Sequence, residues 1–177
     1  SMILLGNNEM KTNFLIISVF ILAFAQVSSF TYAVAPPEVD WNVSYGGYID
    51  QDWGTSIKQT LDGGFIIGGR TELGLKDNIW LFKADSNGNR LWDRVLDGVS
   101  ATDVIETSDG GYALVGYPIP NLFKTDSNGN LLINKSFSRN SSIPTVARSI
   151  KQTLDGGFVL AGYLQEYYGY KDIYVVK

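Results

Sequence analysis

Two acidic turn segments have the spacing that best suggests chemistry. Oxygen-bearing side chains at alternate positions, as in a calcium-binding loop, occur at Asp85, Asn87 and Asn89 and again at Asp126, Asn128 and Asn130. An EF-hand loop also needs glycine at its sixth position and glutamate at its twelfth, and the first copy has Arg90 and Leu96 there. We therefore predict hairpin turns in which Asp and Asn cap backbone amides, with calcium binding as a minor alternative.

Catalytic residues are scarce. The 177 residues include no histidine and no cysteine, which removes the commonest general base, the commonest metal ligand and the usual nucleophilic triads. Paired carboxylates could still cleave glycosides. However, the recurring aspartates fall in turns, and Glu72, Glu106 and Glu166 occur at unmatched places. The sequence predicts no catalytic residue, no cofactor, no firm metal site and no enzyme activity.

Three lysines, Lys83, Lys124 and Lys177, recur once in each copy of a longer pattern. A ligand site rarely needs one lysine per repeat. A structural role is therefore expected, either in ion pairs with nearby aspartates or along one face.

The longer pattern is a repeat. The stretch from Ser56 to Gly69, SIKQTLDGGFIIGG, returns at Asp103–Gly116 and at Ser149–Gly162. The aspartates of the three DGG turns, Asp62, Asp109 and Asp155, are 47 and then 46 residues apart (109 − 62 and 155 − 109). Periods of 20 to 50 residues are typical of propellers and solenoids.

Each copy is predicted to be a β-hairpin, because Asp-Gly-Gly supplies the positive φ angles that a tight turn requires. The second strand of each hairpin is a continuous apolar run, at Phe65–Ile67, Tyr112–Val115 and Phe158–Ala161. Such runs favour a strand buried on both faces. Each run leads to a glycine, Gly69, Gly116 or Gly162, where close backbone approach is expected.

A second hairpin follows in the first copy, with strands at Ile79–Ala84 and Arg90–Val95 around the DSNGN turn. The connection before it, Arg70–Asn78, is predicted to be a variable loop. The third copy reaches only the strand at Ile173–Lys177. Trp41–Tyr45 matches the Trp92–Leu96 strand, so it is predicted to be an isolated fourth strand that could complete the last unit by pairing with the Ile173 strand. The second copy has the same second hairpin, with strands at Leu122–Thr125 and Leu131–Ile133, so the predicted strands total twelve.

The four-strand unit resembles a β-propeller blade. The run from Phe65 to Gly69, followed by Asn78–Trp80, Asp85 and Trp92, is similar to the kelch repeat. It resembles more closely the DGGF-type blades of exported prokaryotic and archaeal propeller proteins. The resemblance covers Trp41–Lys177 and implies an all-β fold of three blades of about 46 residues. Propellers typically have four to eight blades, so the chain would be a partial propeller, part of a larger assembly of subunits, or a β-trefoil.

The first 35 residues are predicted to be a secretory signal peptide with an upstream extension. Lys11 precedes an apolar run, Phe14–Ala25, and small residues lead to Ala33–Ala35, which is the order of a signal peptide. The run is shorter than the roughly 20 residues of a spanning helix. We therefore expect a secreted or cell-surface protein whose repeat domain is 36–177, in contact with a membrane only if the signal is uncleaved.

The partner class follows from charge and aromatic residues. With a net charge of −4 and no basic block, nucleic acid is not an expected partner. The ligand-contact candidates are Glu166, Tyr167, Tyr168 and Tyr170, in the variable loop expected across Tyr163–Asp172. We expect a non-catalytic module for protein or polysaccharide binding, with a fragment of a secreted propeller glycoside hydrolase or lyase as the alternative. Open blade edges could also self-associate, and glycosylation sequons occur at Asn42, Asn134 and Asn140.

Overall fold

The computed structural model describes residues 39–46, 51–138, 145–165 and 169–177. Residues 40–177 form one compact unit. Its described part contains eleven strands and no α-helix. The strands are β1 (Trp53–Gln59), β2 (Phe65–Leu73), β3 (Lys76–Ala84), β4 (Arg90–Leu96), β5 (Ser100–Glu106), β6 (Tyr112–Tyr117), β7 (Asn121–Thr125), β8 (Leu131–Ser136), β9 (Thr145–Gln152), β10 (Phe158–Gln165) and β11 (Lys171–Val176).

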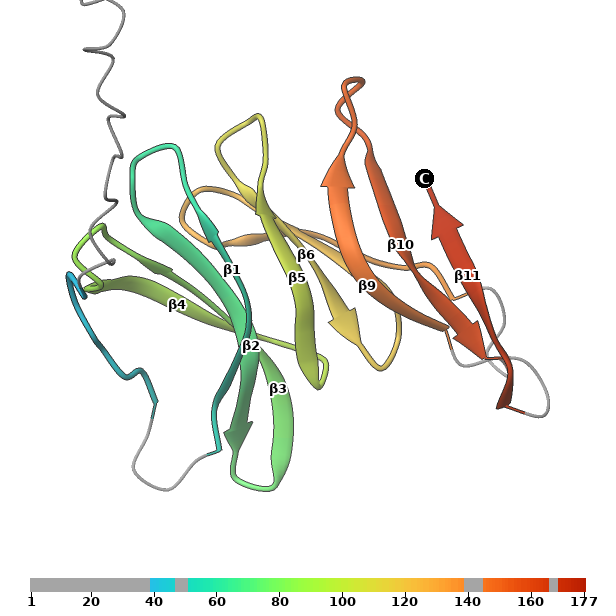
Figure 1. The fold of residues 1–177 in the computed structure, drawn as a ribbon, viewed down its shortest axis with the longest axis horizontal. Helices are drawn as coiled ribbons and strands as arrows, with labels where there is room; N and C mark the ends of the chain where they lie inside the picture. The colour runs from blue at the N-terminus through green and yellow to red at the C-terminus, as the bar shows by residue number, and fades with distance from the viewer. Residues whose placement is uncertain (1–38, 47–50, 139–144, 166–168) are drawn as a thin grey trace, which may run out of the picture. The chain divides into compact units, whose positions relative to one another are not determined.

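Each repeat forms its own antiparallel sheet with the strands in chain order (Figure 1). Sheet 1 is β1-β2-β3-β4, sheet 2 is β5-β6-β7-β8, and sheet 3 is β9-β10-β11. The prediction of an all-β fold built from four-strand units is confirmed for the first two copies. The described strands form no closed sheet, so the barrel of a β-trefoil is not present among them.

The hairpins alternate between two ends of the sheets. The DGG hairpins β1–β2, β5–β6 and β9–β10 lie toward the upper edge of Figure 1, and the turns that follow β2 and β6 lie toward the lower edge. We call the lower edge the variable end, because the turns there differ among the repeats. The DGG turns, which recur in all three repeats, therefore lie at one end of the sheets, and the turns that differ among the repeats lie at the other.

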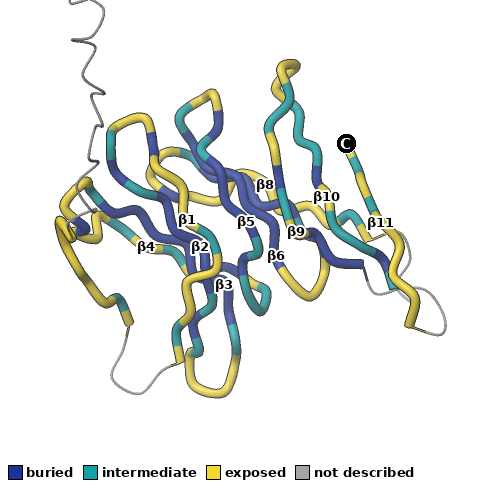
Figure 2. The backbone as a smooth tube through the Cα atoms, viewed as in Figure 1, coloured by how far each residue is buried: buried dark blue, intermediate teal, exposed yellow. Residues whose placement is uncertain are grey.

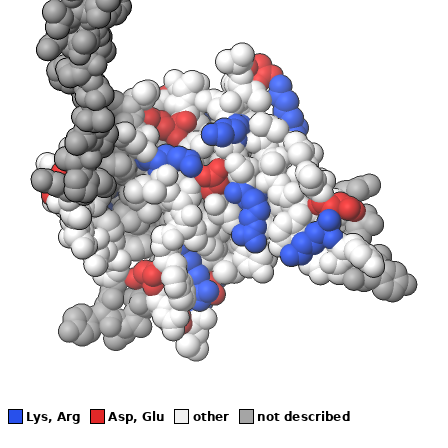
Figure 3. Space-filling model, viewed as in Figure 1, with Lys and Arg blue, Asp and Glu red and all other residues white. Residues whose placement is uncertain are grey.

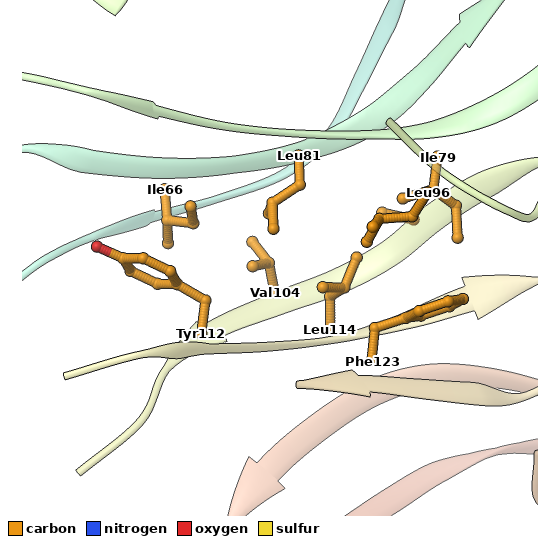
Figure 4. Packing of buried hydrophobic residues seen from close by; sticks show 9 residues of the cluster. Ile66, Ile79, Leu81, Leu96, Val104, Tyr112, Leu114 and Phe123 are labelled. Atoms are coloured by element: carbon orange, nitrogen blue, oxygen red, sulfur yellow. The ribbon is translucent and has the colours of Figure 1, made fainter. Parts of the chain in front are cut away.

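The core lies between the sheets. Ile66, Ile79 and Leu81 of sheet 1 meet Leu114 and Phe123 of sheet 2 in one buried cluster, and Figure 4 shows these side chains pointing toward one another. A second cluster joins sheet 2 to sheet 3 and contains Ile105, Ala113, Val115, Leu122, Ala147, Ile150 and Leu160. Apolar burial between sheets is therefore the main force that stacks the three units.

The apolar runs of the second strands are buried on both faces in only two of the three sheets. Residues Ile66–Gly69 of β2 and Tyr112–Gly116 of β6 are buried, as predicted. In β10, Ala161 is exposed, and Figure 2 shows lighter, less buried backbone in sheet 3. Sheet 3 packs against sheet 2 on one face, and its other face meets no further sheet among the described residues.

The prediction of an isolated strand at Trp41–Tyr45 was wrong. The segment has no strand pairing, and β11 pairs with β10. Instead it lies against sheet 1: the Trp41 ring packs edge-on to Phe65 with centroids 5.8 Å apart, and the Tyr45 ring lies 4.8 Å from that of Phe82. Aromatic packing on an apolar sheet face therefore holds the segment without a strand ladder.

The prediction of a loop at Arg70–Asn78 was also wrong. Strands β2 and β3 remain paired up to Leu73 and Lys76, so only Gly74 and Leu75 form the turn. Gly74 has a φ of 68°, which glycine adopts without strain. Likewise, β10 and β11 pair as far as Gln165 and Lys171, which shortens the connection expected across Tyr163–Asp172.

Close backbone approach is confirmed at Gly69 and Gly162, which lie within β2 and β10. A Cβ built on Gly69 would lie 2.1 Å from the Trp53 carbonyl oxygen, and one on Gly162 would lie 1.9 Å from that of Val146. Both clashes arise beside a bulge in the pairing with the first strand of the sheet. At Gly116, the obstacle is the Ile79 Cδ1 atom, at 2.6 Å.

Gly69→Ala is expected to lower the free energy of unfolding by about 1–3 kcal/mol, because the methyl group must displace the β1 backbone. Gly54, directly opposite in the ladder, is the matched control, since a Cβ there meets nothing within 4 Å. Urea denaturation of the two alanine variants measures the difference. Equal stabilities would contradict the close approach.

Candidate functional site

The repeated lysines form ion pairs with the aspartates of the DGG turns. Lys83 Nζ lies 2.9 Å from Asp62 Oδ2, and Lys124 Nζ lies 2.9 Å from Asp109 Oδ2. Lys177 makes the same pair with Asp155, at 2.7 Å. The lysine side chains of the first two pairs are 3% and 7% exposed, whereas Lys177 is 59% exposed. The structural role predicted for these lysines is confirmed.

The second glycine of the first two DGG turns, Gly64 and Gly111, makes room for this pair. A Cβ on Gly64 would lie 2.4 Å from the Ala84 carbonyl oxygen and 2.5 Å from Lys83 Nζ. Gly63 has the positive φ, 81°, whereas Gly64 is required for space. The sequence correctly predicted a positive φ in the turn, but it did not indicate that one glycine provides the positive φ and the next provides the space.

Hydrogen bonds from Thr60, Lys83 and the Gly64 amide lower the pKa of Asp62 from 3.8 to about 2. The Thr60 hydroxyl donates to Asp62 Oδ1 at 2.5 Å. Because the folded-state pKa is depressed, the stabilisation is present above about pH 4 and is lost as the pH falls toward 2. The pKa values of Asp109 and Asp155 are lowered as well, chiefly by hydrogen bonds from Thr107 and from Lys177, respectively.

The free energy of unfolding is therefore expected to fall between about pH 4 and pH 2. Asp62→Asn removes one of the titrating groups and should make this fall shallower. Urea midpoints measured across the range for both proteins test the prediction. An identical pH dependence in the variant would contradict the assigned role of Asp62.

The DSNGN segments use their carboxylates within the turn. Asp85 Oδ1 accepts hydrogen bonds from the amides of Asn87 and Asn89, at 2.9 and 2.8 Å, and Oδ2 accepts one from the Asn89 side chain at 2.9 Å. Asp126 is bound in the same way by Asn128 and Asn130. These bonds lower the pKa of both aspartates, with the Asn89 and Asn130 side chains as the main causes. The predicted capping turns are confirmed, and within the described ranges no group of three or more acidic side chains is placed to hold a metal.

The variable end has exposed apolar side chains on each of its turns. These are Leu73 and Leu75 in sheet 1, Tyr117 and Ile119 in sheet 2, and Tyr170 in sheet 3. The Tyr117–Pro118 peptide bond is cis. Of the predicted contact residues, Tyr170 is exposed, whereas Glu166, Tyr167 and Tyr168 lie outside the described residues.

Cations stack on aromatic rings at the same end. Arg70 lies over the Trp53 ring, 4.4 Å from its centroid. Tyr163, at the position equivalent to Arg70, has Arg148 at 5.7 Å and Lys171 at 4.5 Å from its ring centroid. A cavity of about 410 Å³ lies beside them, lined by Thr55, Ser100, Ala101, Thr102, Tyr117 and Arg148. No local sequence pattern indicated this grouping, because the cavity joins the first strands of all three repeats.

A second cavity, of about 400 Å³, opens on the face of sheet 1 that looks away from sheet 2. Its lining is mainly apolar and includes Trp41, Tyr45, Ile57, Phe65, Ile67 and Phe82. The match of Trp41 to Trp92 was the one sequence signal that pointed to this place. The unpaired segment 41–45 thus forms one wall of a hollow on sheet 1.

Charged side chains of both signs are interspersed on the face drawn in Figure 3. The described residues on this face form no continuous basic field of the kind that binds nucleic acid. The sequons at Asn42 and Asn134 are exposed, and Asn140 lies outside the described residues. Within the described ranges, no helix has the length and apolar character needed to cross a membrane.

No family model matches the chain, and no curated protein sequence matches it. A crystal structure of a protein of unknown function from Bacteroides caccae is similar, with a TM-score of 0.51 and 11% sequence identity. The match covers 77% of this chain and 49% of that one, so it spans about half the length of that protein. At this identity, the likeness concerns the fold alone.

Proposed function

We propose that this protein is an exported, non-catalytic module of the β-propeller type that binds protein or polysaccharide at the cell surface. The variable end is the contact surface. One observation carries the proposal: a repeated scaffold presents turns of different length and sequence, each of which has an exposed apolar side chain among its described residues. Binding residues are commonly placed on variable connections of a rigid scaffold.

The sheet order supports the propeller-type arrangement. Propeller blades are four-stranded antiparallel sheets, and sheets 1 and 2 have this form with strands in chain order. Lysine–aspartate pairs and capped turns fix the opposite end of each sheet. Substitutions at the variable end therefore leave the framework intact, which is what a family of binding modules needs.

The chemistry of the variable end favours an anionic ligand with sugar or peptide groups that can stack on an aromatic ring. Tyr117 offers an exposed aromatic face, and Arg148 offers a guanidinium beside the same cavity. Aromatic rings stack on sugar or peptide groups, and arginine binds carboxylates through paired hydrogen bonds. A carboxylated polysaccharide and an acidic peptide segment both fit this description.

The binding test uses polygalacturonate as an acidic polysaccharide and a poly-glutamate peptide, with neutral dextran for comparison. Arg148→Ala is expected to weaken binding to the acidic probes by roughly tenfold, about 1.4 kcal/mol. Lys151→Ala, an exposed change on the same strand β9, is the matched control and should leave affinity unchanged. Equal losses in both variants, or equal binding of dextran, would contradict a specific site at the variable end.

Export is tested separately by expressing the full chain in a bacterial host and fractionating the cells. The expected result is a processed protein outside the cytoplasm, with an N-terminus near residue 36. An unprocessed chain that stays in the cytoplasm would contradict the localisation without affecting the binding surface.

A further inference from the structure

Several equivalent apolar positions in the repeats are buried where a neighbouring sheet is present and exposed where it is missing. Ile150 in sheet 3 is 0% exposed, and its equivalent in sheet 1, Ile57, is 54% exposed. In the opposite direction, Ile79 in sheet 1 is 0% exposed and its equivalent in sheet 3, Ile173, is 87% exposed. Sheet 1 and sheet 3 therefore each have one face with the apolar pattern of a sheet interface but no described sheet against it.

The two faces correspond to the two opposite sides of the interface between sheets 1 and 2. Ile79 and Leu81 pack against Val104, Tyr112, Leu114 and Phe123 of the next sheet. The residues of sheet 1 at the positions of those four are Ile57, Phe65, Ile67 and Phe82, and all four line the cavity of about 400 Å³. The residues of sheet 3 at the positions of Ile79 and Leu81 are Ile173 and Val175, and both are exposed. The cavity on sheet 1 is therefore lined by the residue types that, in sheet 2, receive the apolar face of a neighbouring sheet.

A hydrogen-bond series between the sheets supports this match. The Leu61 amide donates to Glu106 Oε2 of the next sheet at 2.8 Å, and the Ser108 amide donates to Gln152 Oε1 at 2.8 Å. The next donor in the series is the amide of Leu154 in sheet 3. The acceptor position equivalent to Glu106 and Gln152 is Gln59 in sheet 1, which is exposed.

The segment 41–45 occupies the place of a fourth strand from a preceding sheet. Trp92 of β4 packs on the next sheet's DSNGN turn, where a Cβ on Gly129 would lie 2.6 Å from its ring. Trp41 packs in the same way on the turn of sheet 1, where a Cβ on Gly88 would lie 2.8 Å from its ring. Trp92 also contacts Tyr112, at 5.6 Å between centroids, as Trp41 contacts the equivalent Phe65.

We propose that two copies of this chain join head to tail, with residues 41–45 of each copy completing the three-stranded sheet 3 of the other. The face of sheet 3 that carries Ile173 and Val175 then packs into the cavity on sheet 1 of the other copy. Two such interfaces bring the six described sheets of the two copies into one ring, within the four to eight typical of propellers, and relate the copies by a two-fold axis. It goes beyond the proposed binding function and does not depend on it.

The ladder of sheet 1 fixes the register. Lys83 pairs with Trp92, and Leu81 with Arg94. The equivalent pairs across the two copies are Lys177 with Trp41, and Val175 with Val43. Opposed residues of antiparallel strands have Cα atoms about 4.5–5.5 Å apart, a separation that a disulfide can bridge.

Mass measurement by light scattering on the chain from Pro36 onward, which contains the whole compact unit, tests the dimer. The unchanged protein is expected to have the mass of two chains. Ile57→Asp or Ile173→Asp should raise the dissociation constant by roughly a hundredfold, because each buries a charge at the interface. Leu61→Asp, which changes an exposed side chain in a DGG turn, should leave the dimer intact. A single-chain mass for the unchanged protein would overturn the proposal and would indicate that the two faces serve another partner.

Cross-linking tests the register and remains informative if a variant associates weakly. The chain contains no cysteine, so a Val43→Cys, Val175→Cys protein can form only engineered disulfides. Oxidation is expected to give a covalent two-chain species in high yield. Leu132→Cys with Val175→Cys is the matched control, because Leu132 is as exposed as Val175 but lies outside the expected ladder, and this protein should stay single-chain. Equal yields from both proteins would contradict the pairing of residues 41–45 with β11.

Discussion

Ile79→Ala is expected to lower the free energy of unfolding by about 2–5 kcal/mol, the usual cost of truncating a fully buried isoleucine. Ile79 is 0% exposed and lies in the cluster between sheets 1 and 2. Ile173, at the equivalent position, is 87% exposed. Ile173→Ala should therefore change the stability by less than about 0.5 kcal/mol.

Both changes are best made in an Ile57→Asp background, which keeps the chain as a single copy under the proposed assembly. Urea denaturation then compares the same substitution at two equivalent positions. If the two variants lose equal stability, the exposed face of sheet 3 is covered within one chain, and the open arrangement of the sheets is wrong.

Asp109→Ala is expected to lower the free energy of unfolding by about 2–3 kcal/mol. The change leaves the ammonium group of Lys124, whose side chain is 7% exposed, without its carboxylate partner. Removing one partner from a buried ion pair is costly because the other charge stays buried. The exposed position of Asp109 keeps the cost below the roughly 3–5 kcal/mol of a fully buried pair.

Two companion variants separate charge burial from loss of the turn. Lys124→Met in the Asp109→Ala background removes the uncompensated charge and should recover part of the stability. Asp155→Ala breaks the exposed pair with Lys177 and should have a smaller effect, since water solvates the remaining ammonium. Thermal or urea unfolding of these variants gives the comparison. A larger loss at Asp155 than at Asp109 would contradict the role of burial.

Local structure was well predicted by the sequence because short-range chemistry determines it. The DGG turn at Asp62 needs a positive φ, and the DSNGN turn at Asp85 caps its own amides, so each forms the same way wherever it occurs. The apolar runs also predicted strands correctly. Their burial depended on which neighbouring sheet was present, which the runs themselves do not encode.

The errors arose where long-range packing decides the structure. Arg70–Asn78 has polar residues and a glycine, yet a continuous ladder to β3 satisfies its backbone groups. Trp41–Tyr45 matches a strand in sequence but lacks a strand to pair with among the described residues. The cavity beside Arg148 joins residues from three repeats, and no local pattern indicated it.

Hydrogen–deuterium exchange at two protein concentrations tests whether the outer faces of sheets 1 and 3 pack against each other between copies. At the higher concentration, we expect slower amide exchange in β1 and β11 and in the segment 41–45. Exchange in β5, β6 and β7, most of whose residues are already buried, should be unchanged. Exchange in β1 and β11 that does not depend on concentration would contradict the packing of these two faces between copies.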